Sequence, residues 1–139
     1  MTSLPYLLGA LVATLQAHPL CKKVATVETK EFSPEQFFFK VRAELIDEGQ
    51  LQVRVYYNQG HVDYAYQLFT DVPLLRWDNK EEFLHLATYP HHHHDAQGNV
   101  RSSPLAGNPV RDMGVVLQAV SEFLAGKAES SGGGGVDDG

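Results

Sequence analysis

Hydrophobic residues recur every three or four positions near both ends of the chain. Leucine and valine follow this spacing over residues 4–15, with Ser3 in front as an N-cap and His18-Pro19 behind. A second run of the same kind occupies residues 109–126, and Gly126 is its expected end. The pattern therefore predicts one amphipathic helix near each end of the chain.

Between these two helices the hydrophobic period changes to two, which indicates β-strands. Residues 21–31 carry β-branched side chains but alternate only weakly, which is typical of an edge strand. The alternation is strong in three further runs separated by tight turns: residues 35–45, 51–57 and 61–69. The sequence thus predicts an antiparallel meander of three or four strands with one apolar face.

The region after the meander is less regular. Residues 72–79 predict a short strand that ends in a turn, and residues 80–86 a helical turn. Residues 87–100 predict extended segments around a turn at 95–99, which would add a hairpin to the sheet. We therefore expect an α+β fold with an N-terminal helix, an antiparallel β-meander of four or more strands, an added hairpin, and a C-terminal helix packed on one face of the sheet.

Composition fits a single small domain. The chain has 139 residues, of which 43% are hydrophobic, and this length suffices for one core. We expect one domain over residues 1–127 and a flexible tail over residues 128–139, where four glycines follow one another. The net charge of −6 provides no broad field for nucleic acid, so any RNA contact requires a local basic patch.

The compartment can also be inferred from composition. Cys21 is the only cysteine, so an internal disulfide is excluded and a reducing environment is favoured. No run of apolar residues reaches the length of about 18 that a membrane span needs. We therefore expect a cytoplasmic protein without a membrane partner.

Histidine is concentrated in one short stretch, since five of the seven histidines lie between positions 85 and 94. Side chains on an extended strand alternate between its two sides. If the segment after Pro90 is extended, His92 and His94 point one way, and His91 and His93 the other. Alternation therefore narrows the candidate site to His92 and His94.

Two imidazoles on one strand face suit two kinds of chemistry. Together with a carboxylate, Asp95 or Asp78, they would chelate a divalent metal. Alternatively they form an acid/base pair, because an ordinary histidine pKa of about 6.5 allows proton exchange at neutral pH. Metal-free RNA cleavage needs such a pair, plus a cation such as Arg76 for the charged phosphorane. A surface tract that binds nickel only adventitiously is the third interpretation.

Two further groups of residues have both a structural and a functional interpretation. In the segment 76–79, Trp77 is typical of a core anchor and Asp-Asn of a turn, yet all four lie just upstream of the histidines. The polar face of the meander carries cations and a tyrosine, which suit either a solvated surface or a phosphate backbone. These residues are Lys40, Arg42, Arg54 and Tyr56.

The two motifs together resemble the TumE-like toxin family of prokaryotic toxin–antitoxin systems. The resemblance rests on Arg-aromatic-Asp-Asn at 76–79, on His85, and on Tyr-Pro-His-His-x-His at 89–94, and it covers about residues 5–125. It implies a growth-inhibiting toxin that a cognate antitoxin protein neutralises. It leaves the molecular target open.

Three hypotheses follow. The first is a toxin that acts on RNA or the translation machinery, as an endoribonuclease without a required cofactor. Its expected catalytic residues are His92, His94, Arg76, Asp78 and His85, and its expected substrate-binding residues are Lys40, Arg42, Arg54, Tyr56 and Trp77. The second is a metal-dependent hydrolase, with a divalent ion held by His92, His94 and Asp95. The third is a non-enzymatic protein whose histidine hairpin binds a partner.

Overall fold

The computed structural model describes residues 2–137 of the chain, with side chains described over residues 2–127. Helix α1 (Leu4–Ala17) opens at Ser3, whose hydroxyl accepts a hydrogen bond of 3.3 Å from the backbone N–H of Tyr6. Its leucines at 7, 11 and 15 are buried, as their spacing predicts. The expected N-terminal helix is confirmed.

The strands form one antiparallel sheet in which spatial order follows sequence order, with β1 at one edge and β7 at the other. The turn at Gln59-Gly60 has φ values of 47° and 89°, which a two-residue hairpin turn of type I′ requires. Both the meander and the added hairpin are therefore confirmed. The strands are β1 (Cys21–Ser33), β2 (Gln36–Leu45), β3 (Gln50–Asn58), β4 (His61–Phe69), β5 (Pro73–Asp78), β6 (His92–His94) and β7 (Val100–Ser102).

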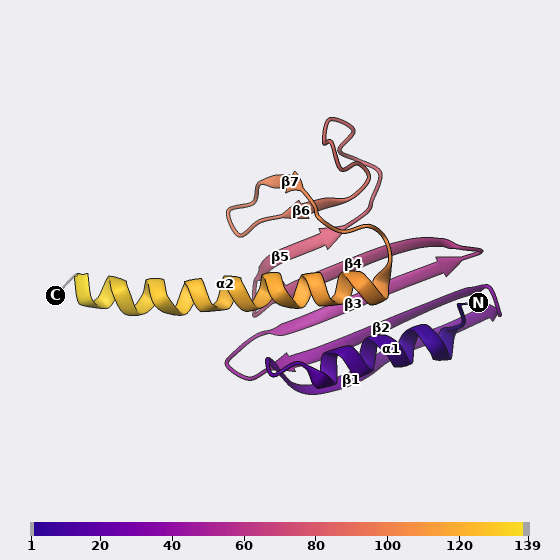
Figure 1. Cartoon of the computed structure of the whole chain (residues 1–139), viewed down its shortest axis with the longest axis horizontal. Coiled ribbons are helices and arrows are strands. Elements are labelled where there is room, and N and C mark those ends of the chain that lie inside the picture. Colours follow the sequence, from indigo (N-terminus) through magenta and orange to yellow (C-terminus); the bar gives the residue numbers. More distant parts are fainter. Residues whose placement is uncertain (1, 138–139) are drawn as a thin grey trace.

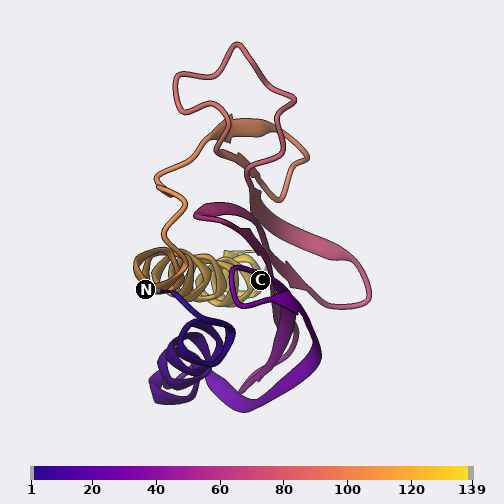
Figure 2. The same ribbon diagram turned by 90° about the vertical axis from the view of Figure 1, so that its right-hand side faces the viewer.

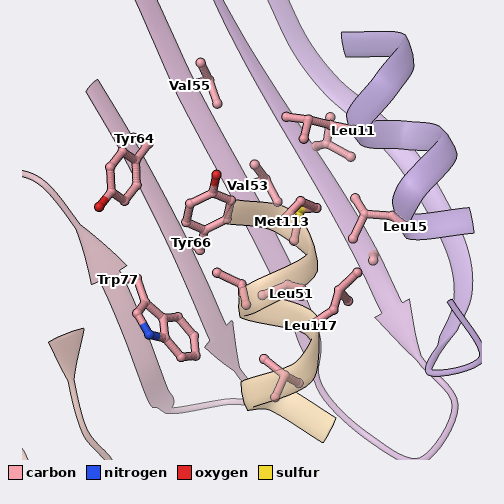
Figure 3. Close-up of a cluster of buried hydrophobic side chains, with 14 of the residues drawn as sticks. Leu11, Leu15, Leu51, Val53, Val55, Tyr64, Tyr66, Trp77, Met113 and Leu117 are labelled. Carbon is pink, nitrogen blue, oxygen red and sulfur yellow. The ribbon is translucent and has the colours of Figure 1, made fainter. Parts of the chain in front are cut away.

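Both helices cover the same face of this sheet (Figures 1 and 2). The buried cluster lies between the helices and the strands, and it includes Leu11 and Leu15 of α1, Met113 and Leu117 of α2, and Tyr66 and Trp77 of the sheet (Figure 3). In the described part of the chain no helix covers the opposite face, which we call the polar face. The packing of the C-terminal helix on one face is thus confirmed.

Helix α2 (Pro109–Asp137) is longer than the sequence predicts, because it continues beyond the expected end at Gly126. Once a helix has formed, each further residue adds one backbone hydrogen bond, so glycine weakens a helix without necessarily ending it. At its start, the Asn108 side chain accepts hydrogen bonds from the N–H groups of Val110 and Arg111. The division into a domain and a flexible tail stays a prediction.

The segment between β5 and β6 forms successive turns, and the helical turn expected at residues 80–86 is wrong. A short helix is stable mainly when it buries an apolar stripe, and this segment has none, since Leu84 is 75% exposed. No helix in the described residues is long and apolar enough to cross a membrane.

Candidate functional site

The register of the sheet creates a row of side chains across the polar face. Lys40 of β2 pairs with Arg54 of β3, which pairs with Ala65 of β4. Ala65 in turn pairs with Asp78 of β5, and Asp78 with His92 of β6. Neighbouring strands lie about 4.8 Å apart, so the row joins the basic strands to the histidine hairpin over roughly 20 Å.

Asp78 is the centre of this site. Its carboxylate accepts a hydrogen bond of 2.7 Å from the Arg76 guanidinium and one of 3.0 Å from the backbone N–H of Lys80. Nε2 of His92 lies 2.8 Å from one carboxylate oxygen, and Nε2 of His94 lies 3.9 Å from the other. The carboxylate is 8% exposed, so these charges interact in a largely water-free environment.

His94 is the imidazole of this group that a substrate can reach. Its side chain is 34% exposed, whereas that of His92 is 1% exposed. The two rings meet edge to face with centroids 4.9 Å apart, and the Phe83 ring contacts both edge on. Partial burial lowers the pKa of His94 below its ordinary value, so the ring is neutral at pH 7 and able to accept a proton.

The orientation of the His92 ring is unusual. Its Nδ1 lies 3.2 Å from the carbonyl oxygen of Pro90 and donates toward it. Its Nε2 lies 2.8 Å from Asp78, but no acceptor lies along the N–H direction, so this buried nitrogen makes no hydrogen bond. A buried polar atom without a partner is costly. A cation lying near both atoms would satisfy this contact.

A concave region of about 470 Å³, which we call the polar hollow, lies beside Asp78 on the polar face. The expected binding residues Lys40, Arg54 and Tyr56 line it together with Arg76 and Asp78. The hollow therefore joins the basic strands to two of the catalytic candidates, Arg76 and Asp78, while His92 and His94 lie beside Asp78 without lining the hollow. The other lining residues are Phe38, Asp63, Tyr64, Ala65, Asn79 and Lys80.

The alternate residues of the same two motifs lie on the apolar face. Trp77 is 3% exposed and stacks on His93 at 4.7 Å, and the His93 ring also lies 3.2 Å from the carbonyl oxygen of Arg76. Burial lowers the pKa of His93 below its ordinary value. The Tyr64 hydroxyl lies 2.8 Å from Nδ1 of His91. Trp77 therefore lies away from the polar hollow, on the opposite side of the sheet.

Asn79 has a structural position at the end of β5. Its side-chain oxygen accepts a hydrogen bond of 3.0 Å from the N–H of Tyr64, and its amide donates one of 2.7 Å to the carbonyl of Val62. The side chain thus satisfies two backbone groups of β4 where the ladder to β5 stops. It fixes the position of Asp78, its neighbour in the chain.

Besides Trp77, two further residues expected at the site lie outside it, Arg42 and His85. Arg42 donates a hydrogen bond of 2.7 Å to Gln52, one row along the sheet from Lys40 and Arg54. His85 is exposed and contacts only the edge of Phe83 among aromatic rings, at 6.4 Å.

Asp95 does not join the histidines, so its assignment as the carboxylate ligand is wrong. Its side chain accepts hydrogen bonds from the N–H groups of Gln97 and Asn99 and forms an ion pair with Arg101. These interactions hold the pKa of Asp95 at about 2. Because Asp95 follows His94 directly, strand alternation turns its side chain away from the site.

The carboxylate that meets the histidines is Asp78. Its ligand atoms and those of His92 and His94 all lie within 4.8 Å of one another, a spacing that a single metal ion can bridge. This group comes from two strands that are paired side by side. Periodicity within one strand therefore identified the two histidines, but only the β5–β6 register selects between the two aspartates.

Sequence reasoning missed three residues of the site: Phe38, Lys80 and Phe83. Phe38 was detectable, because it stands on the polar side of an alternating run that has Phe37 and Phe39 on the core side. Lys80 and Phe83 belong to the irregular segment after β5, where the hydrophobic residues follow neither the helical nor the strand period. Their positions follow from the path of that segment over the hairpin.

The matching of the sequence to known families decides the relationship. The chain matches the model of the family described as Toxin TumE over residues 11–126. The chain belongs to the TumE toxin family. No curated protein and no solved structure matches it. The family match spans α1 from Leu11, the whole sheet and most of α2. Membership of a toxin family implies a cognate antitoxin as partner.

Proposed function

We propose that this TumE toxin inhibits growth by cleaving RNA, with His94 as the group that transfers the proton. One observation carries the proposal: Arg76 and Asp78 line the same hollow as Lys40 and Arg54, and Nε2 of His94 lies 3.9 Å from the Asp78 carboxylate. An accessible neutral imidazole beside a guanidinium suits phosphodiester chemistry, because the first removes a proton and the second stabilises the charge that develops on phosphorus.

The proposed reaction is attack by a ribose 2′-hydroxyl on the neighbouring phosphorus. Nε2 of His94 accepts the hydroxyl proton, the new P–O bond forms, and the bond to the 5′-oxygen of the next nucleotide breaks. The leaving oxygen takes a proton from water. The products are a 2′,3′-cyclic phosphate and a 5′-hydroxyl, so no external oxidant or cofactor takes part. Arg76 contacts the phosphate oxygens in this geometry.

The buried residues position this machinery. His92 packs against His94 and lies between the Pro90 carbonyl and the Asp78 carboxylate. Asp78 orients the Arg76 guanidinium through their hydrogen bond of 2.7 Å. In this proposal His92 and Asp78 are positioning residues, while Lys40, Arg54 and Tyr56 bind the substrate backbone in the polar hollow.

The test is controlled expression of the wild type, His94→Ala and Arg76→Ala, with growth and total RNA followed. Loss of a proton-transfer group reduces rates by about a hundredfold or more, so His94→Ala should relieve growth arrest and leave RNA intact. His61→Ala is the matched control, because His61 is exposed and lies outside the polar hollow. Cleaved RNA should carry cyclic phosphate ends.

Two outcomes would contradict the proposal. Purified wild-type toxin that arrests cells but leaves RNA and ribosomes intact would exclude RNA cleavage. A His94→Ala variant that loses antitoxin binding together with toxicity would favour the alternative of a non-enzymatic partner-binding protein.

A metal-dependent form of the same site is the second candidate, and the His92 ring favours it. Its Nδ1 donates to the Pro90 carbonyl, which leaves a lone pair on Nε2 in the neutral ring. That nitrogen is buried, unpartnered and 2.8 Å from a carboxylate oxygen, the arrangement that a bound cation satisfies. Asp78, His92 and His94 would hold the ion, which would supply a Lewis acid for the phosphate.

Metal analysis of untagged protein tests this second candidate. A built site loses its metal in His94→Ala and keeps it in His91→Ala, since His91 lies on the other side of the strand. A merely adventitious histidine tract would lose metal equally in both variants. Protein without bound metal, and with activity unchanged in chelator, would exclude the metal-dependent form.

A further inference from the structure

Two aromatic side chains stand on the polar face where the alternation calls for polar residues. Phe38 of β2 and Tyr56 of β3 are direct cross-strand partners, and both line the polar hollow. Both are only partly buried. The Tyr56 hydroxyl accepts a hydrogen bond of 2.6 Å from the amide of Gln36, which fixes the orientation of its ring.

Phe38 is not part of the hydrophobic core. Its chain neighbours Phe37 and Phe39 are both fully buried on the other face, and Phe37 stacks on Tyr57 there. Phe38 therefore presents its ring to the side of the sheet that no described helix covers. Phe32, an exposed aromatic residue of the edge strand, does not line the polar hollow, whereas Phe38 lines it with an aromatic cross-strand partner and cations beside it.

Cations surround this aromatic pair. Lys40 follows Phe38 by two residues on the same strand face, and Arg54 precedes Tyr56 in the same way. With Arg76 and Lys80, the polar hollow has four cations against the two carboxylates of Asp63 and Asp78, on a chain whose net charge is −6. Lys40 also lies 4.0 Å from Glu28 of β1. The local charge complements phosphate.

Aromatic rings interleaved with cations on an open sheet face fit one class of ligand. Unpaired nucleobases stack on such rings while their phosphates contact the cations, whereas a duplex hides the base faces in its own stack. We propose that Phe38 and Tyr56 form a stacking platform for an unpaired base, so that this toxin takes single-stranded RNA. The inference rests on the proposed function.

The positions of the platform and of His94 also define a path for the RNA strand across the sheet. The platform on β2 and β3 and the proton-transfer group His94 on β6 lie on the same face, about three to four strand spacings apart across the sheet and two rows apart along the strands. A single strand whose base stacks at Phe38 has its neighbouring phosphates at Lys40 and Arg54. Its continuation toward β6 reaches Arg76 and His94. Phe38 is thus a positioning residue for the cleavage step.

The test measures binding of fluorescently labelled RNA to full-length toxin in the His94→Ala background, which prevents cleavage. The probes are a short single-stranded oligoadenylate, its duplex with oligouridylate, and a single strand in which abasic sites replace the bases. Phe38→Ala should weaken single-strand binding by about fivefold or more, since this is the smallest effect expected for one lost stacking contact. Phe38→Tyr should restore it.

Phe32→Ala is the matched control, because it removes an exposed phenylalanine of the neighbouring edge strand β1 that does not line the polar hollow. It should bind RNA as the background protein does. The abasic strand should bind the background protein and Phe38→Ala with equal affinity. Melting temperatures of all variants separate a local effect from unfolding.

The proposal is overturned if Phe38→Ala binds the single strand as tightly as the background protein. It is also overturned if the duplex or the abasic strand binds as well as the intact single strand, as expected of a purely electrostatic or protein-binding surface. Failure of RNA cleavage is seen separately, as intact RNA incubated with wild-type toxin. A platform that fails while wild-type cleavage persists leaves the proposed function standing.

Discussion

The two sides of the β5–β6 ladder are built from the same two short motifs but have opposite properties. On one side Trp77 and His93 stack against each other on the apolar face, and Nδ1 of His93 lies 3.2 Å from the backbone carbonyl oxygen of Arg76. On the other side the buried Asp78 carboxylate lies 2.8 Å from Nε2 of His92, next to an accessible His94. Residues adjacent in the chain therefore belong to a core on one side and to a reactive group on the other.

This difference shows that the alternate residues of the two motifs have different structural roles. One set of alternate residues packs the hairpin against the core, and the other set forms the candidate site on the polar face. Anchoring is what permits the charged side, because the buried Asp78 carboxylate requires its partners to be held in fixed positions. Substitutions on the two sides should therefore separate stability from activity.

The largest effect is expected on the anchoring side. Trp77→Ala removes a ring that is 3% exposed and leaves a cavity, so the free energy of unfolding should fall by about 3–5 kcal/mol. Urea denaturation of the purified protein measures this loss. A Trp77→Ala protein as stable as the wild type would show that the apolar side of the ladder does not anchor the hairpin.

The next effect concerns the junction of the two sides. Asn79→Ala leaves the Tyr64 N–H and the Val62 carbonyl without their partner, which should cost about 1–3 kcal/mol of unfolding free energy. Asn99→Ala is the matched control, because Asn99 is exposed in the hairpin turn. Equal stabilities of the two variants by urea denaturation would contradict the structural assignment of Asn79.

Neighbouring histidines should respond in opposite ways. His93→Ala removes the stack on Trp77 and the contact with the Arg76 carbonyl, and it should lower the free energy of unfolding by about 1–2 kcal/mol. His94→Ala should change it by less than about 0.5 kcal/mol while abolishing toxicity. Urea denaturation and growth assays of both variants test this exchange of effects. If both variants behaved alike, the separation of stability and activity between the two sides of the ladder would be contradicted.

The smallest effect is expected at the tip of the hairpin and depends on pH. The folded state holds the pKa of Asp95 at about 2, below its ordinary value of 3.8, mainly through the Arg101 contact. This contribution to stability is therefore present above about pH 4 and is lost as the pH falls toward 2. Asp95→Asn should be slightly less stable than the wild type at pH 6, and the two should converge at pH 2. A difference that persists at pH 2 in thermal unfolding would show another cause.

Most of the fold was predictable because its signals are local. The three- and four-residue spacing of leucines produced α1, and strict alternation in residues 35–45 produced β2 with its buried phenylalanines. The prediction of a helical turn at residues 80–86 was wrong. The few apolar residues there form no buried stripe, so neither the helical period nor the strand period applies. The predicted end of α2 at Gly126 was wrong, because residue propensities alone do not stop a helix that has already formed.

The candidate site was predictable only in part. Alternation after Pro90 correctly placed His92 and His94 on one side and His93 on the other. It could not show that His92 is buried, nor that Arg42 lies one row away from the polar hollow, because both depend on partners from other strands.

The sequence by itself determined which residues share a side of each strand, since the backbone geometry of a helix or strand fixes the direction of successive side chains. The family match over residues 11–126 likewise comes from the sequence alone. Only the tertiary structure decided that Asp78 and not Asp95 meets the histidines, because that contact arises from the pairing of β5 with β6. Register between strands far apart in the chain is a property of the folded sheet, and the site depends on it.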